Sequence, residues 1–131
     1  MTTHTPDNSN EQAGEYAGIR ETLHPNGVLE LLLDLNENNL LSLEAFRTIE
    51  ATLKRWASNQ SVKVLVFGSA REQFFSNGLD PRNFYDREAA DVREFVQASV
   101  DVMQAIYNIT LPVIFAKPGH CMAAGGVMAL C

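Results

Sequence analysis

The stretch VKVLVFGSAREQFFSNGLDPRNF, residues 62–84, decides the fold of this chain. It opens with a run of β-branched and aromatic residues that is typical of a buried strand. It then reaches Gly78, which allows a sharp turn, and Asp80 followed by Pro81, the pattern of a helix N-cap with proline in the first turn. The stretch therefore predicts a strand, a tight corner and the start of a helix.

The flanking sequence predicts further strands and helices in alternation. The segment Pro25-Asn26-Gly27 separates two extended runs and predicts a turn between β-strands. The second run, 28–35, is nearly all apolar, so we expect a strand that is buried on both faces. The other expected elements are a helix over 43–57 capped by Ser42, a strand over 62–69, a helix over 89–107, a strand over 111–119 and a helix start within 122–131.

Apolar stripes at helical spacing indicate which face each expected helix buries. The first stripe consists of Leu43, Phe46, Ile49, Leu53 and Trp56, and the second of Val92, Phe95, Val96, Ser99, Val102, Met103 and Ile106. Strands that alternate with helices imply right-handed crossovers and a mostly parallel sheet, so the fold class is α/β.

Composition limits the classes of function. The chain has 131 residues, 46% of them apolar, which suits one globular domain with a real core. The net charge of −6, without a cluster of Lys or Arg, argues against a nucleic-acid partner. We expect no membrane span and no secretory signal, and hence a cytoplasmic protein. Residues 1–18 could bury almost nothing and are expected to be a disordered tail before a domain over 19–131.

Neither a metal nor a dinucleotide is expected as a cofactor. Cys121 and Cys131 are too few for a disulfide framework, and His120 beside Cys121 lacks the further ligands that zinc requires. No G-x-G-x-x-G pattern follows the first strand, so a dinucleotide site is not expected. We expect two buried, reduced thiols in a cytoplasmic protein.

Two glycine-containing corners fall where parallel strands are expected to end, at Gly78 and at Gly125-Gly126. Ligands of open α/β sheets bind at the carboxyl ends of strands. Two backbone N–H groups directed at one oxygen stabilise the negative charge that develops on a carbonyl, and no side chain is needed. The corners therefore suggest an oxyanion hole, with a pair of ordinary glycine turns as the alternative.

From residue 19 onward, the order of segments resembles the enoyl-CoA hydratase/isomerase (crotonase) family. NLLSLEAF, 39–46, is similar to that family's Asn-Ala-Leu-Ser helix opening, and 62–84 is similar to its strand followed by Phe-Ser/Cys-Ala-Gly-Ala-Asp-Leu. LPVIFAKPGHCMAAGGVMAL, 111–130, resembles its Pro-Val-Ile-Ala…Gly-x-Ala-x-Gly-Gly-Gly segment. The resemblance implies the N-terminal half of a ββα spiral, with mostly parallel buried strands and crossover helices.

The resemblance also implies a function and its residues. The family binds acyl-CoA thioesters and stabilises a thioester enolate, so coenzyme A would arrive as part of the substrate and no separate cofactor is implied. The oxyanion donors would be the backbone N–H groups of Leu79 and Ala124. Asp80, Pro81 and Arg82 would lie along the coenzyme A, where Arg82 could meet a phosphate. The alternative for Arg82 is a solvated surface residue.

One departure from the family pattern concerns proton transfer. Hydratases carry a Glu where this chain has Val127, which cannot transfer a proton. Isomerase members have an apolar residue there and use a Glu that comes later in the chain. Locally, Asp80 is expected to cap a helix, a lone His120 is a weak candidate base, and Ser76 has no evident His–Asp partners for a triad.

Two hypotheses follow from this departure. In the first, the chain represents the N-terminal part of an enzyme of fatty acid metabolism, an isomerase or a lyase, and is inactive as these 131 residues. In the second, it is a short, catalytically inactive paralogue that acts as a CoA-binding or protein-interaction module. Members of the family commonly form trimers through later segments. We expect this chain to expose apolar surface and to self-associate.

Overall fold

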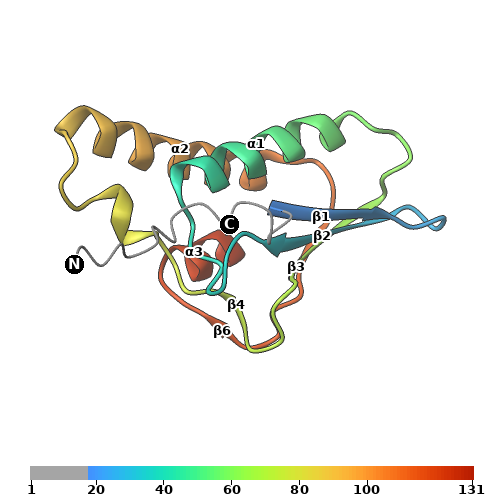
Figure 1. Ribbon diagram of the computed structural model, residues 1–131. Helices are drawn as coiled ribbons and strands as arrows, with labels where there is room; N and C mark the ends of the chain where they lie inside the picture. The colour runs from blue at the N-terminus through green and yellow to red at the C-terminus, as the bar shows by residue number, and fades with distance from the viewer. Residues whose placement is uncertain (1–17) are drawn as a thin grey trace, which may run out of the picture.

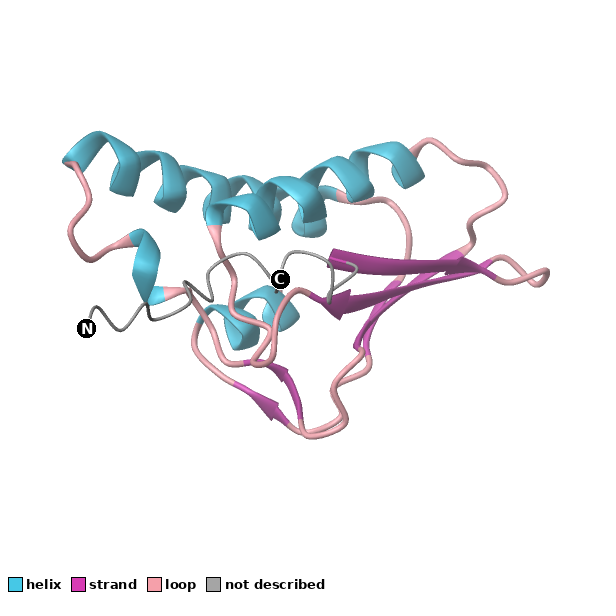
Figure 2. Ribbon diagram, viewed as in Figure 1, coloured by secondary structure: helices cyan, strands magenta, loops and turns pink. Residues whose placement is uncertain are grey.

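The computed structural model describes residues 18–131, which form a four-stranded sheet, a two-stranded sheet and the helices packed beside them (Figures 1 and 2). Residues 1–17 of the expected tail lie outside the described residues. Gly18 already belongs to the first strand, so regular structure begins one residue before the expected boundary. No helix within 18–131 is both long enough and apolar enough to cross a membrane.

The larger sheet has the order β1-β2-β3-β5. Strands β1 (Gly18–Leu23) and β2 (Val28–Asp34) form the expected antiparallel hairpin. Strand β2 pairs in parallel with β3 (Val64–Ser69), and β3 pairs in parallel with β5 (Val113–Phe115). The mostly parallel α/β fold expected from the sequence is confirmed.

Strand β2 is not buried on both faces, so that expectation was wrong. Leu29, Leu31 and Leu33 are fully buried, whereas the alternate residues Glu30 and Leu32 are partly exposed. Successive side chains of a strand point to opposite faces of the sheet. Among the described residues the long helices cover only one of these faces, which explains the alternation.

The two long helices lie side by side across one face of the sheet (Figure 1). Helix α1 (Leu43–Ala57) begins after Ser42, whose hydroxyl accepts a hydrogen bond from the N–H of Ala45 at 3.1 Å. Helix α2 (Ala89–Asn108) agrees with the prediction to within one residue. Ser42 is the expected cap, because its oxygen satisfies one of the free N–H groups of the first turn.

The buried face of α2 differs from the expected stripe. Its buried residues are Phe95, Ala98, Val102 and Ile106. Val96, which the spacing placed in the stripe, is 45% exposed. The ring of Phe95 contacts the rings of Phe46 and Phe84, with centroids 5.8 and 5.1 Å away, and this packing turns Val96 away from α1.

The segment 111–119 is not one strand, which corrects the third predicted strand. Strand β5 ends at Phe115, and a separate strand β6 (His120–Cys121) pairs in parallel with β4 (Phe74–Ser76) to form the second sheet. Pro118 lies between β5 and β6 and has no N–H to donate to a sheet. At Gly119 a Cβ would lie 2.2 Å from the carbonyl oxygen of Gln73, so only glycine fits this crossing.

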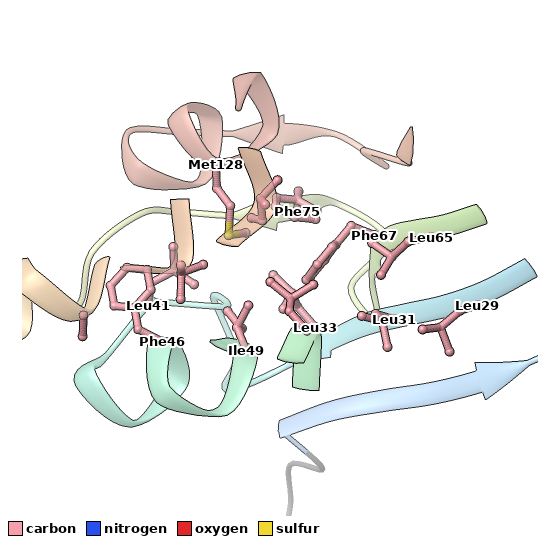
Figure 3. Close-up of a cluster of buried hydrophobic side chains, with 14 of the residues drawn as sticks. Leu29, Leu31, Leu33, Leu41, Phe46, Ile49, Leu65, Phe67, Phe75 and Met128 are labelled. Carbon is pink, nitrogen blue, oxygen red and sulfur yellow. The ribbon is translucent and has the colours of Figure 1, made fainter. Parts of the chain in front are cut away.

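A single hydrophobic core joins both sheets and the helices. The ring of Phe115 lies 5.5 Å from that of Phe67 in the larger sheet and 5.8 Å from that of Phe75 in the smaller one. Helix α3 (Ala124–Leu130) adds the fully buried Met128, which points into this cluster (Figure 3). The core therefore holds strands β4 and β6 against the larger sheet.

Candidate oxyanion site

The first corner is the turn after β4, and its geometry leaves one backbone donor free. Gly78 has φ +99°, a conformation that glycine adopts without a steric penalty. Its carbonyl accepts a hydrogen bond from the N–H of Leu41 at 2.8 Å, and the N–H of Asp80 donates to the Leu41 carbonyl at 2.9 Å. In the trans peptide that joins residues 78 and 79, the N–H of Leu79 points opposite to the Gly78 carbonyl and so away from Leu41. This N–H has no acceptor among the described residues.

The second corner joins β6 to α3 and leaves another free donor. The N–H groups of Gly125 and Gly126 both donate to the carbonyl of Met122, at 2.9 and 3.4 Å. The N–H of Ala124, the first residue of α3, has no acceptor within residues 18–131. The chain enters this helix through Ala123, which has φ +47° and ψ −123°. The positive φ of this corner therefore falls on Ala123 and not on the donor residue Ala124.

The parallel pairing of β4 and β6 brings the two corners together. The N–H of Met122 donates to the carbonyl of Ser76 at 3.0 Å, which ties one strand end to the other. A Cβ at Gly78 would lie 2.9 Å from the Cβ of Ala123 and 3.6 Å from the nitrogen of Ala124. The free N–H groups of Leu79 and Ala124 therefore belong to adjacent corners.

Asp80 caps the short helix η2 (Pro81–Asn83), as the sequence predicted. Its side chain is 3% exposed and accepts a hydrogen bond from the N–H of Arg82 at 3.0 Å. The guanidinium of Arg82 donates to both carboxylate oxygens of Asp80, at distances from 2.7 to 3.1 Å. These hydrogen bonds hold the pKa of Asp80 below its usual value, although burial of the carboxyl opposes the shift.

Pro81 and Arg82 lie at the surface beside this corner. The side chain of Arg82 is 77% exposed, and its ion pair with Asp80 raises its pKa. One edge of the guanidinium is therefore bound by Asp80, while much of the side chain faces solvent. An Arg held in this way can offer its outer N–H groups to an anion.

Val127, at the position of the hydratase Glu, is 52% exposed. It lines an open apolar groove between α2 and α3. The other residues of this groove are Ser99, Val100, Met103, Gln104, Tyr107 and Cys131. The residues that line this groove include no carboxylate, so none of them is an equivalent of the hydratase Glu.

The remaining candidates for chemistry are dispersed. His120 is exposed, and its backbone N–H donates to the Gln73 carbonyl. Cys121 and Cys131 are free thiols, but Cys121 is only partly buried and Cys131 is exposed, so the expectation of two buried thiols was wrong. Partial burial raises the pKa of Cys121. Within the part of the chain that the structure describes, no three His, Cys, Asp or Glu side chains gather as a metal would need.

The motif over 39–46 begins with Asn39, but the sequence did not predict its role, which is to organise the loop beside the first corner. The residue is fully buried and has φ +46°. Its side-chain amide donates to the carbonyls of Leu33 and Phe75 and to the hydroxyl of Ser69, at 2.9 to 3.1 Å. Its side-chain oxygen accepts from the N–H of Leu35 at 3.0 Å. The tolerance of Asn for a positive φ was the one local signal, because asparagine adopts such turns more readily than most residues.

The family model for enoyl-CoA hydratase/isomerase matches residues 24–131. The chain therefore belongs to the enoyl-CoA hydratase/isomerase family. The resemblance noted in its three sequence motifs is confirmed over most of the chain.

Individual relatives share the fold and part of the sequence. The chain is 32% identical over 92 residues to rat mitochondrial enoyl-CoA delta isomerase 1, and covers 32% of that protein. It is 26% identical over 103 residues to carnitinyl-CoA dehydratase of Proteus mirabilis, and covers 39% of it. The crystal structure of human mitochondrial delta3-delta2-enoyl-CoA isomerase superimposes with a TM-score of 0.83 at 25% identity, over 86% of this chain and 44% of that one. The chain thus spans less than half the length of these relatives.

Proposed function

We propose that this chain binds an acyl-CoA thioester and that the N–H groups of Leu79 and Ala124 stabilise the thioester oxygen as an enolate forms. The observation that carries the proposal is that these two donors lie at adjacent corners and have no acceptor within the described residues. Backbone N–H groups normally have a hydrogen-bond partner, so two free donors at adjacent, partly exposed corners offer a place for an external oxygen. Membership of the family supports the choice of a thioester.

The proposed chemistry is charge stabilisation. When a base takes a proton from the carbon beside a thioester carbonyl, negative charge moves onto the carbonyl oxygen, and two fixed N–H dipoles lower the energy of that state. We propose these donors for this chain and assign the base to none of the described residues, since isomerase members of the family use a Glu that comes later in the chain. Coenzyme A is part of the proposed substrate, and the proposal requires no separate cofactor. Val127 disfavours addition of water at this site, since that step needs an acid or base at its position. Double-bond isomerisation, or a related enolate step, fits better.

The coenzyme A moiety is proposed to lie along Asp80, Pro81 and Arg82. The buried carboxylate of Asp80 holds the guanidinium of Arg82. The exposed edge of this guanidinium could donate to a phosphate. Pro81 begins η2 beside the first corner and offers an apolar surface without a donor. These roles extend the oxyanion proposal from the reacting atoms to the rest of the ligand.

The test compares Leu79→Pro with Leu79→Ala. Proline removes the N–H of residue 79, which makes no hydrogen bond within the described protein, whereas alanine retains it. We expect Leu79→Ala to bind acetoacetyl-CoA, a thioester that forms an enolate readily, within several-fold of the parent chain. Loss of one such donor costs about 10²–10³ in rate in enzymes that depend on it, so Leu79→Pro should weaken binding by a factor of that order.

Isothermal titration calorimetry provides the readout, and circular dichroism provides the control. The spectrum of Leu79→Pro must match that of the parent chain, because proline also restricts Gly78, the residue before it. If a folded Leu79→Pro variant binds acetoacetyl-CoA as tightly as the parent, the assignment of the Leu79 N–H is wrong.

A further inference from the structure

We infer that Ser76 is a positioning residue that sets the two donor N–H groups relative to each other. The inference rests on the proposed function, because it explains how the oxyanion site is built. Ser76 is fully buried at the end of β4. Among the described residues it contacts both corners, one through its hydroxyl and the other through its carbonyl and Cβ.

At the first corner, Ser76 acts through its hydroxyl. The oxygen accepts a hydrogen bond from the N–H of Gly78 at 3.1 Å, and the hydroxyl donates to the carbonyl of Asn39 at 2.7 Å. The peptide unit between residues 77 and 78 is therefore held by the Ser76 hydroxyl. The peptide unit between residues 78 and 79 is held by the hydrogen bond from the N–H of Leu41 to the Gly78 carbonyl. Because that second peptide carries the N–H of Leu79, the two restraints together determine where this donor points.

At the second corner, Ser76 acts through its backbone and its Cβ. Its carbonyl accepts the hydrogen bond from the N–H of Met122 at 3.0 Å. A Cβ at Gly125 would lie 2.8 Å from the Cβ of Ser76 and 3.1 Å from its hydroxyl oxygen. The first turn of α3 therefore rests directly on this side chain. Ala124 lies between Met122 and Gly125, so Ser76 restrains the chain on both sides of the second donor.

These contacts also assign the hydroxyl to positioning and not to covalent catalysis. A serine nucleophile needs a base that accepts its proton. The proton of Ser76 is donated instead to the carbonyl of Asn39, inside the protein. Within residues 18–131, no His, Asp or Glu side chain is hydrogen-bonded to this hydroxyl.

The test measures a ratio of affinities for two ligands, in the 131-residue parent and in Ser76→Ala. Acetoacetyl-CoA probes the oxyanion donors, and S-butyl-CoA, a thioether of similar length that lacks the carbonyl, probes the rest of the site. A displacement of about 1 Å at a reacting centre can cost roughly 10²-fold. We expect the preference for acetoacetyl-CoA to fall by about tenfold or more in Ser76→Ala, while the Kd for S-butyl-CoA stays within about threefold.

Ser69→Ala is the matched control. The hydroxyl of Ser69 also belongs to the Asn39 cluster, where it accepts from the Asn39 side chain and from the N–H of Arg71, both at 2.9 Å. None of its hydrogen bonds involves Gly78 or Gly125. We expect Ser69→Ala to keep the parent's preference. An equal fall in both variants would overturn the positioning role, since it would indicate general loosening of the cluster.

The outcomes separate this inference from the proposed function. A parent chain that does not prefer acetoacetyl-CoA over S-butyl-CoA contradicts the oxyanion site itself. A parent that prefers it, together with a folded Ser76→Ala that prefers it equally, contradicts the positioning role of the Ser76 hydroxyl, which alanine removes while it keeps the Cβ and the carbonyl. If Ser76→Ala does not fold, Ser76→Cys keeps the shape of the side chain with a weaker donor and acceptor. An unchanged preference in that variant overturns the inference as well.

Discussion

Ala123 adopts the most unfavourable backbone conformation of the second corner. Its φ of +47° and ψ of −123° lie outside the regions that L-residues with a Cβ usually adopt, whereas glycine adopts them freely. Its Cβ also lies only 2.9 Å from where a Cβ would stand at Gly78. This residue directly precedes the Ala124 donor, so strain and the candidate site occur at the same place, as they often do at functional sites.

We predict that Ala123→Gly stabilises the chain. Strain of this kind costs about 1–3 kcal/mol, and glycine would relieve it. Glycine also has more conformational freedom in the unfolded chain, which offsets part of this stabilisation. The free energy of unfolding should therefore rise by about 1 kcal/mol. Ala129→Gly, inside α3, is the control and should lower the free energy of unfolding by about 1 kcal/mol. Urea unfolding measures both changes. A destabilised Ala123→Gly variant would show that the alanine conformation carries no strain.

Asp80 should make stability depend on pH. Hydrogen bonds from Arg82 lower the pKa of Asp80 in the folded state. A carboxyl with a lowered folded pKa stabilises the protein above its unfolded pKa, about 3.9, and this contribution is lost as the pH falls through the folded value. Asp80→Asn removes the charge, so the stability difference from the parent should be largest near neutral pH and should shrink in acid below about pH 4. Urea unfolding between neutral and acidic pH tests this, and a difference that stays constant with pH would contradict it.

At the scale of the element, α2 has one buried face and one exposed face of apolar residues. The ring of Phe95 is almost completely buried between Phe46 and Phe84, whereas the adjacent Val96 is 45% exposed. The exposed side continues through Val100 and Tyr107. The spacing of apolar residues alone does not show which face is buried. On both the buried and the exposed face, apolar residues recur three or four positions apart.

Substitutions on the two faces of α2 should therefore differ strongly in their effect on the free energy of unfolding. Phe95→Ala removes a buried ring and should cost about 3–5 kcal/mol of unfolding free energy. Val96→Ala should change it by no more than about 0.5 kcal/mol, as is usual for surface positions. Thermal or urea unfolding of both variants provides the measurement. Equal losses would mean that Val96 is packed in solution and that the helix is rotated relative to the structure described here.

At the scale of the whole molecule, the described surface carries apolar side chains along α2 and α3. They line the groove that contains Val127, and Leu130 at the end of α3 is 88% exposed. We predict that the 131-residue chain self-associates as its concentration rises, because contiguous exposed apolar surface drives association.

Light scattering across a wide range of concentration tests this prediction. A double variant in which Val100 and Tyr107 are both replaced by Gln should associate less, since both residues line the groove. Leu23→Gln is the control, because Leu23 is also an exposed apolar residue but lies in β1, away from the groove. A parent chain that remains monomeric at every concentration would contradict the prediction.

The sequence by itself determined the elements whose signals are local. Ser42 and Asp80 cap the predicted helices because a cap depends on residues within one turn. The turn at Pro25–Gly27 produced the expected hairpin for the same reason. The three family motifs, residues 39–46, 62–84 and 111–130, also sufficed to predict the family and the α/β class.

Only the tertiary structure decided which segments meet. That the strand within residues 111–119 ends at Phe115, before a separate strand β6, fits the close crossing of Gly119 with Gln73, which lies far away in the sequence. The rotation of α2 depends on contacts of Phe95 with two distant rings. Ser76 was visible in the sequence as a possible nucleophile without partners, and its contacts with Gly78, Asn39 and Gly125 arise only when β4 pairs with β6. A free N–H cannot be identified from sequence either, because whether a donor is paired depends on the position of every neighbouring acceptor.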